Sequence, residues 1–137
     1  MTMAIVVGFV PRPEGHAALD RAIEEARLRH TRLVVLNVSR GDALVDSRFA
    51  SSADWQAVQE RLEASGVEHE VAQNVEARDP AEQLLRVAQE TNAELIVIGL
   101  RRRTPVGKLI MGSAAQTILL DAEAPVLAVK AGPDEGR

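Results

Sequence analysis

Cysteine and tyrosine are absent from this sequence of 137 residues, and aromatic residues make up only 2% of it. Without cysteine the chain can form neither a disulfide nor a thiolate metal site, and it has no thiol nucleophile. The aromatic residues are Phe9, Phe49 and Trp55, too few for a base-stacking platform for single-stranded nucleic acid. These absences direct the search for function toward other chemistry.

A long hydrophobic run is also missing, because the apolar runs are strand-sized and far shorter than the ~20 residues that span a bilayer. The formal net charge is −4, so the chain lacks the excess of basic residues that is typical of a nucleic-acid-binding protein. With 46% hydrophobic and 26% charged residues, the composition is that of a soluble globular protein. We therefore expect one cytoplasmic domain over residues 1–132, a loose tail over 133–137, and neither a membrane nor a nucleic-acid partner.

Short apolar runs alternate with amphipathic helical patterns along the chain. The predicted strands are Ala4–Val7, Leu33–Leu36, Val67–Val75, Leu95–Ile98 and Pro125–Val129. The predicted helices include Leu19–Ala26, Trp55–Leu62 before Gly66, a third beginning at Asp79 and Pro80, and Ala114–Leu120. Strands that alternate with helices predict an α/β fold, with a mainly parallel sheet covered on both faces. Ligands of such sheets bind beyond the carboxyl ends of strands, so the ends of the first and fourth strands are the candidate site.

The most informative segment leaves the fourth strand at Gly99 and enters a helical pattern at Gly112 and Ser113. A glycine-rich loop that leads into a helix start can cradle an anion, because backbone N–H groups and the helix dipole face the ligand there. Ser113 is expected to cap this helix. The cluster Arg101–Arg103 adds guanidinium groups that can bind phosphate oxygens, although such runs also occur in merely solvated loops.

Three sharper motifs fail on inspection. A Walker A reading of the loop is excluded, because Arg102 replaces its first glycine and Leu109 replaces its hydroxyl residue. The pair His69–Glu70 begins like the zinc motif H-E-x-x-H, but Gln73 stands where the second histidine belongs. Ser113 has no G-x-S-x-G context, so a nucleophile is not indicated there. The three histidines are scattered, and no metal site is expected.

In these features the chain resembles the universal stress protein family over almost its whole length. The likeness is carried by the first strand and helix, the helix start at Asp79, the run Ala93–Gly99, the Gly112–Ser113 pair and the run Ala124–Val129. The resemblance implies a Rossmann-like three-layer sandwich of five mainly parallel strands in the order 3-2-1-4-5 with four helices. It also implies a homodimer through the fifth strand, at Val126, Leu127, Ala128, Val129 and Lys130.

Two positions depart from the pattern of the nucleotide-binding family members, which carry G-x2-G-x9-G-[ST]. Gly99, Gly112 and Ser113 match this motif, but Arg102 stands where the middle glycine belongs. Val10 stands where the first strand of the family often carries an aspartate that holds the adenine–ribose moiety. Arg102 either blocks the phosphate cradle or supplies charge in its place. Loss of the aspartate would leave a ligand donor unpaired, at a cost of about 1–3 kcal/mol.

Two functions therefore stay open. In the first, the chain is a stress-response protein that binds ATP or a related adenine nucleotide, with or without Mg²⁺. The residues expected to bind the nucleotide are Pro11, Val38, Gly99, Arg101, Arg102, Arg103, Gly112, Ser113 and Ala114. In the second, the chain is a nucleotide-independent dimeric interaction protein with an unidentified protein partner. An enzyme, at most a slow ATPase, ranks last, because no general base or metal carboxylate pair can be assembled near the loop.

Overall fold

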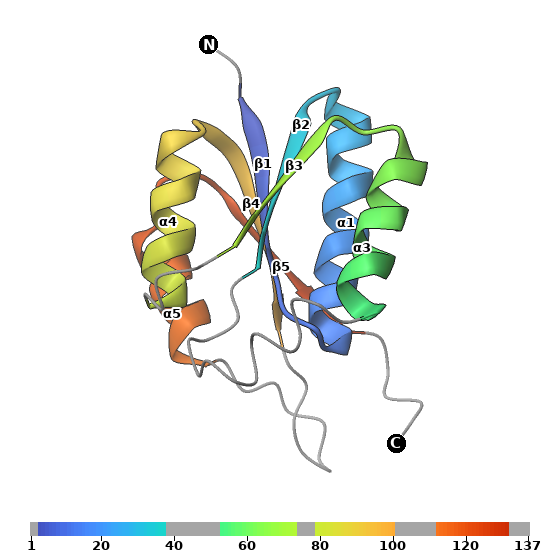
Figure 1. The fold of residues 1–137 in the computed structure, drawn as a ribbon. Helices are drawn as coiled ribbons and strands as arrows, with labels where there is room; N and C mark the ends of the chain where they lie inside the picture. Colours follow the sequence, from blue (N-terminus) through green and yellow to red (C-terminus); the bar gives the residue numbers. More distant parts are fainter. Residues whose placement is uncertain (1–2, 38–52, 74–78, 101–111, 132–137) are drawn as a thin grey trace.

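The computed structural model describes residues 3–37, 53–73, 79–100 and 112–131. Within these residues the chain forms five strands and four helices (Figure 1). In chain order they are β1 (Ala4–Phe9), α1 (Pro13–Arg29), β2 (Arg32–Asn37), α3 (Ala53–Ser65), β3 (His69–Gln73), α4 (Pro80–Glu90), β4 (Ala93–Leu100), α5 (Ser113–Asp121) and β5 (Val126–Lys130). The predicted α/β alternation is confirmed.

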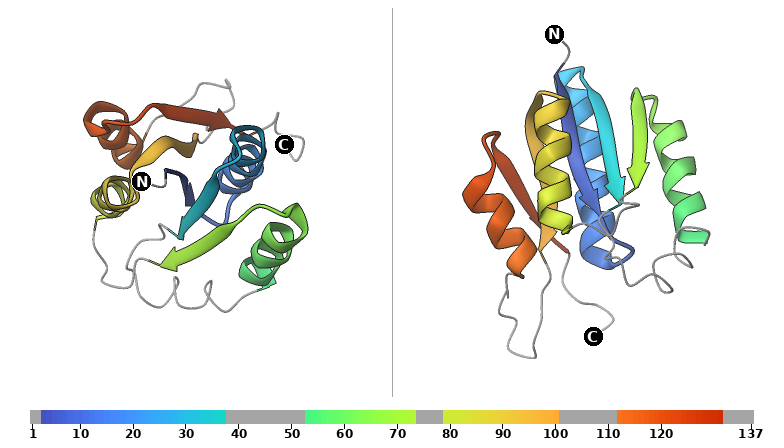
Figure 2. Two further views of the ribbon diagram at one scale, coloured as in Figure 1. Left: turned by 90° about the horizontal axis from the view of Figure 1, so that it is seen from above. Right: turned by 60° about the vertical axis from the view of Figure 1, so that its left-hand side comes forward.

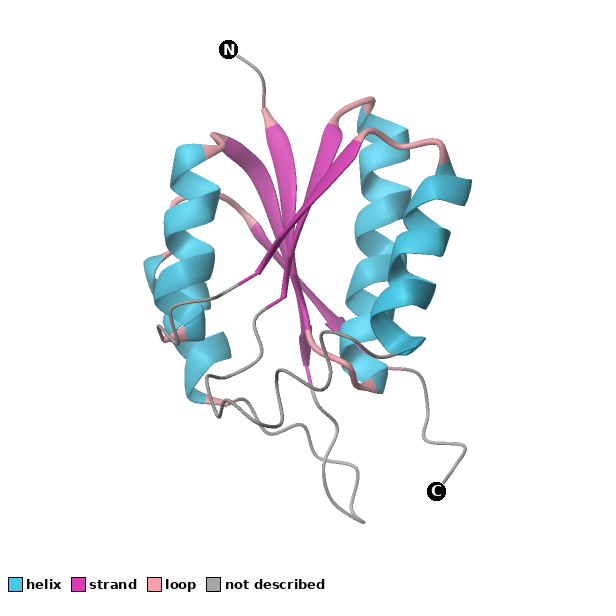
Figure 3. Cartoon of the chain, viewed as in Figure 1, coloured by secondary structure: helices cyan, strands magenta, loops and turns pink. Residues whose placement is uncertain are grey.

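The five strands form one parallel sheet in the order β3-β2-β1-β4-β5, which confirms the predicted topology. Helices α1 and α3 cover one face of the sheet, and α4 and α5 cover the other (Figures 1 and 3). The two further views in Figure 2 show the same three layers. The order places β1 at the centre and leaves β3 and β5 at the edges.

The core has two halves because side chains alternate between the two faces of a strand. On β1, Ile5, Val7 and Phe9 pack with α1 and α3, whereas Ala4 and Val6 pack with α4 and α5. All six residues of β1 are buried, which explains why its sequence is an unbroken apolar run rather than an alternating one.

The helix boundaries follow local signals that the sequence carries. The backbone N–H of Glu82 donates to Asp79 Oδ2 at 3.1 Å, and Pro80 occupies the first turn of α4, so the predicted cap is present. Gly66 has a φ of +75° directly after α3, a left-handed conformation that glycine adopts without steric cost.

The third strand begins later than predicted. β3 spans His69–Gln73 within the described residues, whereas the expected run began at Val67. The backbone carbonyl of Glu68 accepts from Leu33 N–H at 2.9 Å, and ladder pairing with β2 starts at the next residue. Val67 therefore packs against the core from the connection that precedes the strand. Residue 75 lies outside the described residues.

Ion pairs tie the end of α1 to the amino edge of the sheet. Arg29 pairs with Glu25 at 3.1 Å and with Glu94, at the start of β4, at 3.2 Å. The hydrogen bonds that Arg29 donates to these carboxylates, that to Glu25 first, raise the pKa of Arg29 above its usual value. The Arg29 side chain is 42% exposed, so this network orients the two elements more than it stabilises them.

In the described part of the chain, none of the helices has the length and apolar character needed to cross a bilayer.

The Asp79 cap gives a first testable prediction. Asp79→Ala leaves the N–H of Glu82 without its acceptor and should lower the free energy of unfolding by about 1 kcal/mol. Asp79→Asn retains a capping oxygen and should lose less. Urea denaturation of the three proteins measures both differences, and an alanine variant as stable as the unaltered protein would contradict the assignment.

Candidate functional site

The candidate site lies where β1 and β4 part at the carboxyl edge of the sheet. Pairing between these strands ends at Val7–Val97. Beyond that point β1 stays with β2 as far as Phe9–Asn37, and β4 stays with β5 as far as Leu100–Lys130. This divergence is the switch point at which ligands bind in open α/β sheets. Helices α1 and α5 both begin at this edge, on opposite faces of the sheet (Figure 1).

The turn after β1 supplies one side of the site. Arg12 N–H donates to the carbonyl of Val10 at 2.8 Å, which closes a tight turn around the half-buried Pro11. Arg12 is the N-cap of α1 and Pro13 occupies the first turn. The structure thus places Pro11 at the switch point, as predicted, and puts Val10 and the exposed Arg12 beside it.

The start of α5 supplies the other side. Its N-cap is Gly112 and Ser113 is its first residue, so the expectation that Ser113 caps this helix is wrong. Gly112 is extended, with φ −75° and ψ 169°, and its carbonyl accepts the first helical bond, from Gln116 N–H at 3.1 Å. Gly112 and Ser113 are exposed, whereas Ala114 packs against the core. A helix start without a side-chain cap leaves its first N–H groups to other acceptors.

Close backbone contacts join the end of β4 and the turn after β1 to the first turn of α1. A Cβ atom at Gly99 would lie 2.2 Å from the carbonyl oxygen of Glu14, and one at Gly15 would lie 1.8 Å from that of Val10. A Cβ at Gly112 would meet none of the described residues within 4 Å. The two glycines of the matching motif that the structure describes therefore occupy different environments.

An aromatic and charged cluster underlies the turn after β1. The ring of Phe9 meets His16 edge to face at 5.1 Å between centroids and lies 6.1 Å from the ring of Trp55 on α3. Nη2 of Arg61 donates to Nδ1 of His16 at 3.1 Å, and Arg61 also pairs with Asp20. Because arginine is only a donor, Nδ1 is the unprotonated nitrogen of His16 in this arrangement. The cluster fixes α3 against the first turns of α1.

Sequence reasoning missed two buried polar residues at this edge. Glu14, in the first turn of α1, is 9% exposed, and Asn37, at the end of β2, is 4% exposed. The position of Asn37 directly after an apolar run was a usable signal, since strand ends carry site residues in such folds. Nothing local in the sequence marks Glu14, because its burial depends on how α1 crosses β4.

Four of the predicted site residues, Val38 and Arg101–Arg103, lie outside the described residues. The others that were expected to bind nucleotide are Pro11, Gly99, Gly112, Ser113 and Ala114, and all five occur at the carboxyl edge, in the segments that flank the switch point.

Comparison with known proteins shows the family of this chain. The profile of the universal stress protein family matches residues 1–130. A universal stress protein of Mycolicibacterium smegmatis is 50% identical over 126 residues, which cover 92% of this chain and 96% of the relative. The chain belongs to the universal stress protein family. Its fold matches a solved universal stress protein of Archaeoglobus fulgidus with a TM-score of 0.78 and 31% identity, over 95% of this chain and 100% of the other.

Two further family structures contain nucleotides. A universal stress protein of Archaeoglobus fulgidus in complex with dAMP has a TM-score of 0.66 at 23% identity, over 95% of this chain and 98% of that chain. A universal stress protein in complex with cAMP has a TM-score of 0.70 at 22% identity, over 96% and 98%. At these identities the likeness shows a shared fold.

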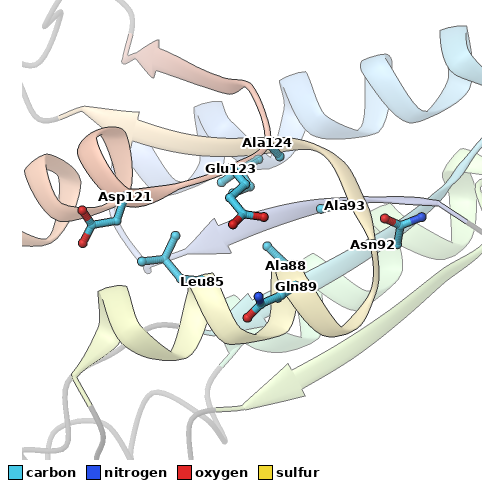
Figure 4. A pocket seen from close by; sticks show the side chains of 9 residues that line it. Leu85, Ala88, Gln89, Asn92, Ala93, Asp121, Glu123 and Ala124 are labelled. Atoms are coloured by element: carbon cyan, nitrogen blue, oxygen red, sulfur yellow. The ribbon is translucent and has the colours of Figure 1, made fainter.

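A separate hollow of about 220 Å³ lies at the opposite end of the sheet, between α4, α5 and the start of β4. Leu85, Ala88 and Ile96 give it an apolar floor, and Asp121 and Glu123 border it. Figure 4 shows Glu123 pointing toward α4 across this hollow. None of the sequence-predicted site residues lines it. Among the described residues, no group of three histidine or carboxylate side chains is arranged to hold a metal ion.

The helix start at Gly112 gives a second prediction. Ser113→Ala should change the free energy of unfolding by less than about 0.5 kcal/mol, because Ser113 is a helical residue and not the N-cap. Removal of a serine cap would instead cost about 1 kcal/mol. Urea denaturation beside Asp79→Ala, a true cap removal, provides the matched comparison. A loss at Ser113 as large as that at Asp79 would restore the capping role.

Proposed function

We propose that this universal stress protein binds an adenine nucleotide, ATP or a related one, at the carboxyl ends of β1 and β4. The observation that carries the proposal is the parting of these strands after Val7–Val97, between the start of α5 at Gly112 and the turn at Pro11. The family members in complex with dAMP and cAMP support it, because they share this fold. The parted strand ends then receive the nucleotide across the switch point.

The phosphate groups belong, in this proposal, at the start of α5. Gly112 is exposed, and no described residue occupies the place where its Cβ would stand, so a phosphate can approach its backbone closely. The helix dipole favours negative charge at this end. Ser113 and Ala114 continue the first turn and contribute N–H groups. Arg101, Arg102 and Arg103 then neutralise phosphate charge, and Mg²⁺, where present, shares that role.

The adenosine belongs on the other side, against Pro11 and Val38. Val10 offers no side-chain acceptor, in contrast to the aspartate often present in the family at this position. The neighbouring side chains on this turn are a proline and an arginine, and neither accepts hydrogen bonds. We therefore propose that apolar contact and backbone groups bind the adenosine. The ribose is then bound more weakly than in family members that keep the aspartate.

The second candidate is a nucleotide-independent dimeric interaction protein. It is favoured by the same departures, Val10 and Arg102, and by the exposed edge of β5. Either function would serve in a cytoplasmic stress response. The decisive experiment is mass spectrometry of the denatured protein after purification without added nucleotide. A co-purified adenine nucleotide supports binding, and an empty protein that also gives no calorimetric signal with ATP supports the interaction protein.

The arginine cluster yields a third prediction. Arg102→Ala should weaken ATP binding by about 1–3 kcal/mol, the scale of a lost charge-assisted hydrogen bond. Arg102→Gly restores the family residue and should weaken binding less, because the backbone can then approach the phosphate. Isothermal titration calorimetry measures both variants. If the triple alanine variant at residues 101–103 binds ATP as well as the unaltered protein, the cluster has no role in binding.

The edge strand yields a fourth prediction, a homodimer through β5. The Pro125 carbonyl accepts from Ile96 N–H at 2.9 Å. Hydrogen-bonding direction alternates along a strand, so residues 125, 127 and 129 face β4, and the N–H of Ala128 faces outward. Ala128→Pro removes an outward donor without breaking the ladder to β4 and should convert the dimer to a monomer. Leu127→Pro would instead break the ladder to β4.

Light scattering after size-exclusion chromatography measures the assembly state. Ala128→Ser keeps the outward N–H and should remain dimeric, which makes it the matched control. A monomer for the unaltered protein at micromolar concentration would refute the dimer.

A further inference from the structure

The side-chain alternation of β4 directs position 99 toward α1. Leu95 and Val97 pack in the half of the core formed with α1 and α3, whereas Ile96 and Ile98 pack in the other half. Two residues beyond Val97, a side chain at Gly99 would point to the same face, where the first turn of α1 crosses. Glycine leaves that space to the helix.

The backbone of α1 fills this space completely. A Cβ at Gly99 would lie 2.2 Å from the carbonyl oxygen of Glu14 and 2.7 Å from its carbonyl carbon, distances that real Cβ atoms do not show. Both are backbone atoms of a helix, so a change of side-chain rotamer cannot relieve the overlap. Gly99 has no positive φ among the described backbone angles. Its glycine is therefore required by space and not by backbone conformation.

Gly15, the next residue of α1, makes a close contact with the turn after β1. A Cβ at Gly15 would lie 1.8 Å from the carbonyl oxygen of Val10, the same oxygen that accepts from Arg12 N–H. The first turn of α1 thus lies between β4, through Glu14, and the turn after β1, through Gly15. A displacement of this helical turn at Gly99 must be transmitted to Val10 and to the residues that follow it.

We propose that Gly99 is a positioning residue of the nucleotide site, which sets the adenosine side through α1 and does not itself cradle the phosphates. This inference rests on the proposed function. It divides the glycines of the matching motif by role. Gly99 locates the turn at Pro11 through Glu14 and Gly15, and Gly112, whose Cβ position meets no described residue, receives phosphate. A ligand that lacks phosphate distinguishes the two roles, because its binding should depend on Gly99 and not on Gly112.

The test introduces the same methyl group at both glycines. Gly99→Ala should weaken adenosine and ATP binding by the same factor, about tenfold, because the turn at Pro11 is displaced whichever ligand binds. Gly112→Ala should weaken ATP and leave adenosine binding unchanged. Calorimetry separates a loss of affinity from mere destabilisation of the fold, because destabilisation would lower the fraction of active protein while its Kd stayed constant. A Gly99→Ala protein that loses ATP affinity but keeps adenosine affinity would overturn the proposal.

Because Gly99→Ala can fail to fold, a measurement on the unaltered protein provides a second test. In ¹⁵N NMR titrations, adenosine should shift the amides of Glu14, Gly15 and Gly99, and inorganic triphosphate should shift Gly112 and Ser113 but not Gly99. A larger shift of Gly99 with triphosphate than with adenosine would overturn the proposal.

A thermal comparison distinguishes failure of this proposal from failure of the proposed function. Gly99→Ala should melt well below Gly112→Ala, since only the first methyl group meets backbone atoms. Equal melting temperatures would remove the steric basis of the positioning role whatever the protein binds. If the unaltered protein binds neither adenosine nor ATP, the proposed function fails, and the positioning role in binding fails with it even when the melting temperatures differ.

Discussion

The fold depends on the burial of β1 between two neighbouring strands and two layers of helices. Its residues pair with β2 on one side and with β4 on the other, and its side chains alternate into both halves of the core. β1 is therefore buried on both faces and along both edges. Because neighbouring strands are parallel, the chain must return over a face of the sheet after each strand, and a helix provides that connection. The remaining elements are positioned relative to this strand.

The same arrangement produces the candidate site. A chain that leaves the central strand must cross toward one neighbour to begin its helix, and α1 crosses the end of β4. That crossing separates the ends of β1 and β4 and brings Glu14 against Gly99. Helix packing and the proposed ligand binding consequently involve the same residues. A glycine can be indispensable at such a point for helix packing even where a sequence motif suggests contact with a ligand.

The departures from the family pattern affect the two sides of the site differently. In the proposed nucleotide site, Val10 lacks the side-chain acceptor that the family aspartate provides, and the residues that follow it on the turn are Pro11 and Arg12. Arg102 changes the phosphate side, where charge can replace a backbone contact because phosphate recognition by guanidinium tolerates several geometries. Under the proposed function, a site altered in this way retains attraction for phosphate more readily than selectivity for the ribose.

The sequence by itself determined the order of strands and helices, because burial on both faces makes the strands apolar and short-range caps such as Asp79 and Gly66 mark the helix ends. The resemblance to the family supplied the strand order. Strand limits were less predictable, since Val67 is apolar through core packing and not through pairing. The cap at Gly112 instead of Ser113 was decided by the backbone path into α5. Only the tertiary structure decided that Glu14 is buried and that Gly99 contacts α1, because both depend on two segments meeting that lie far apart in the chain.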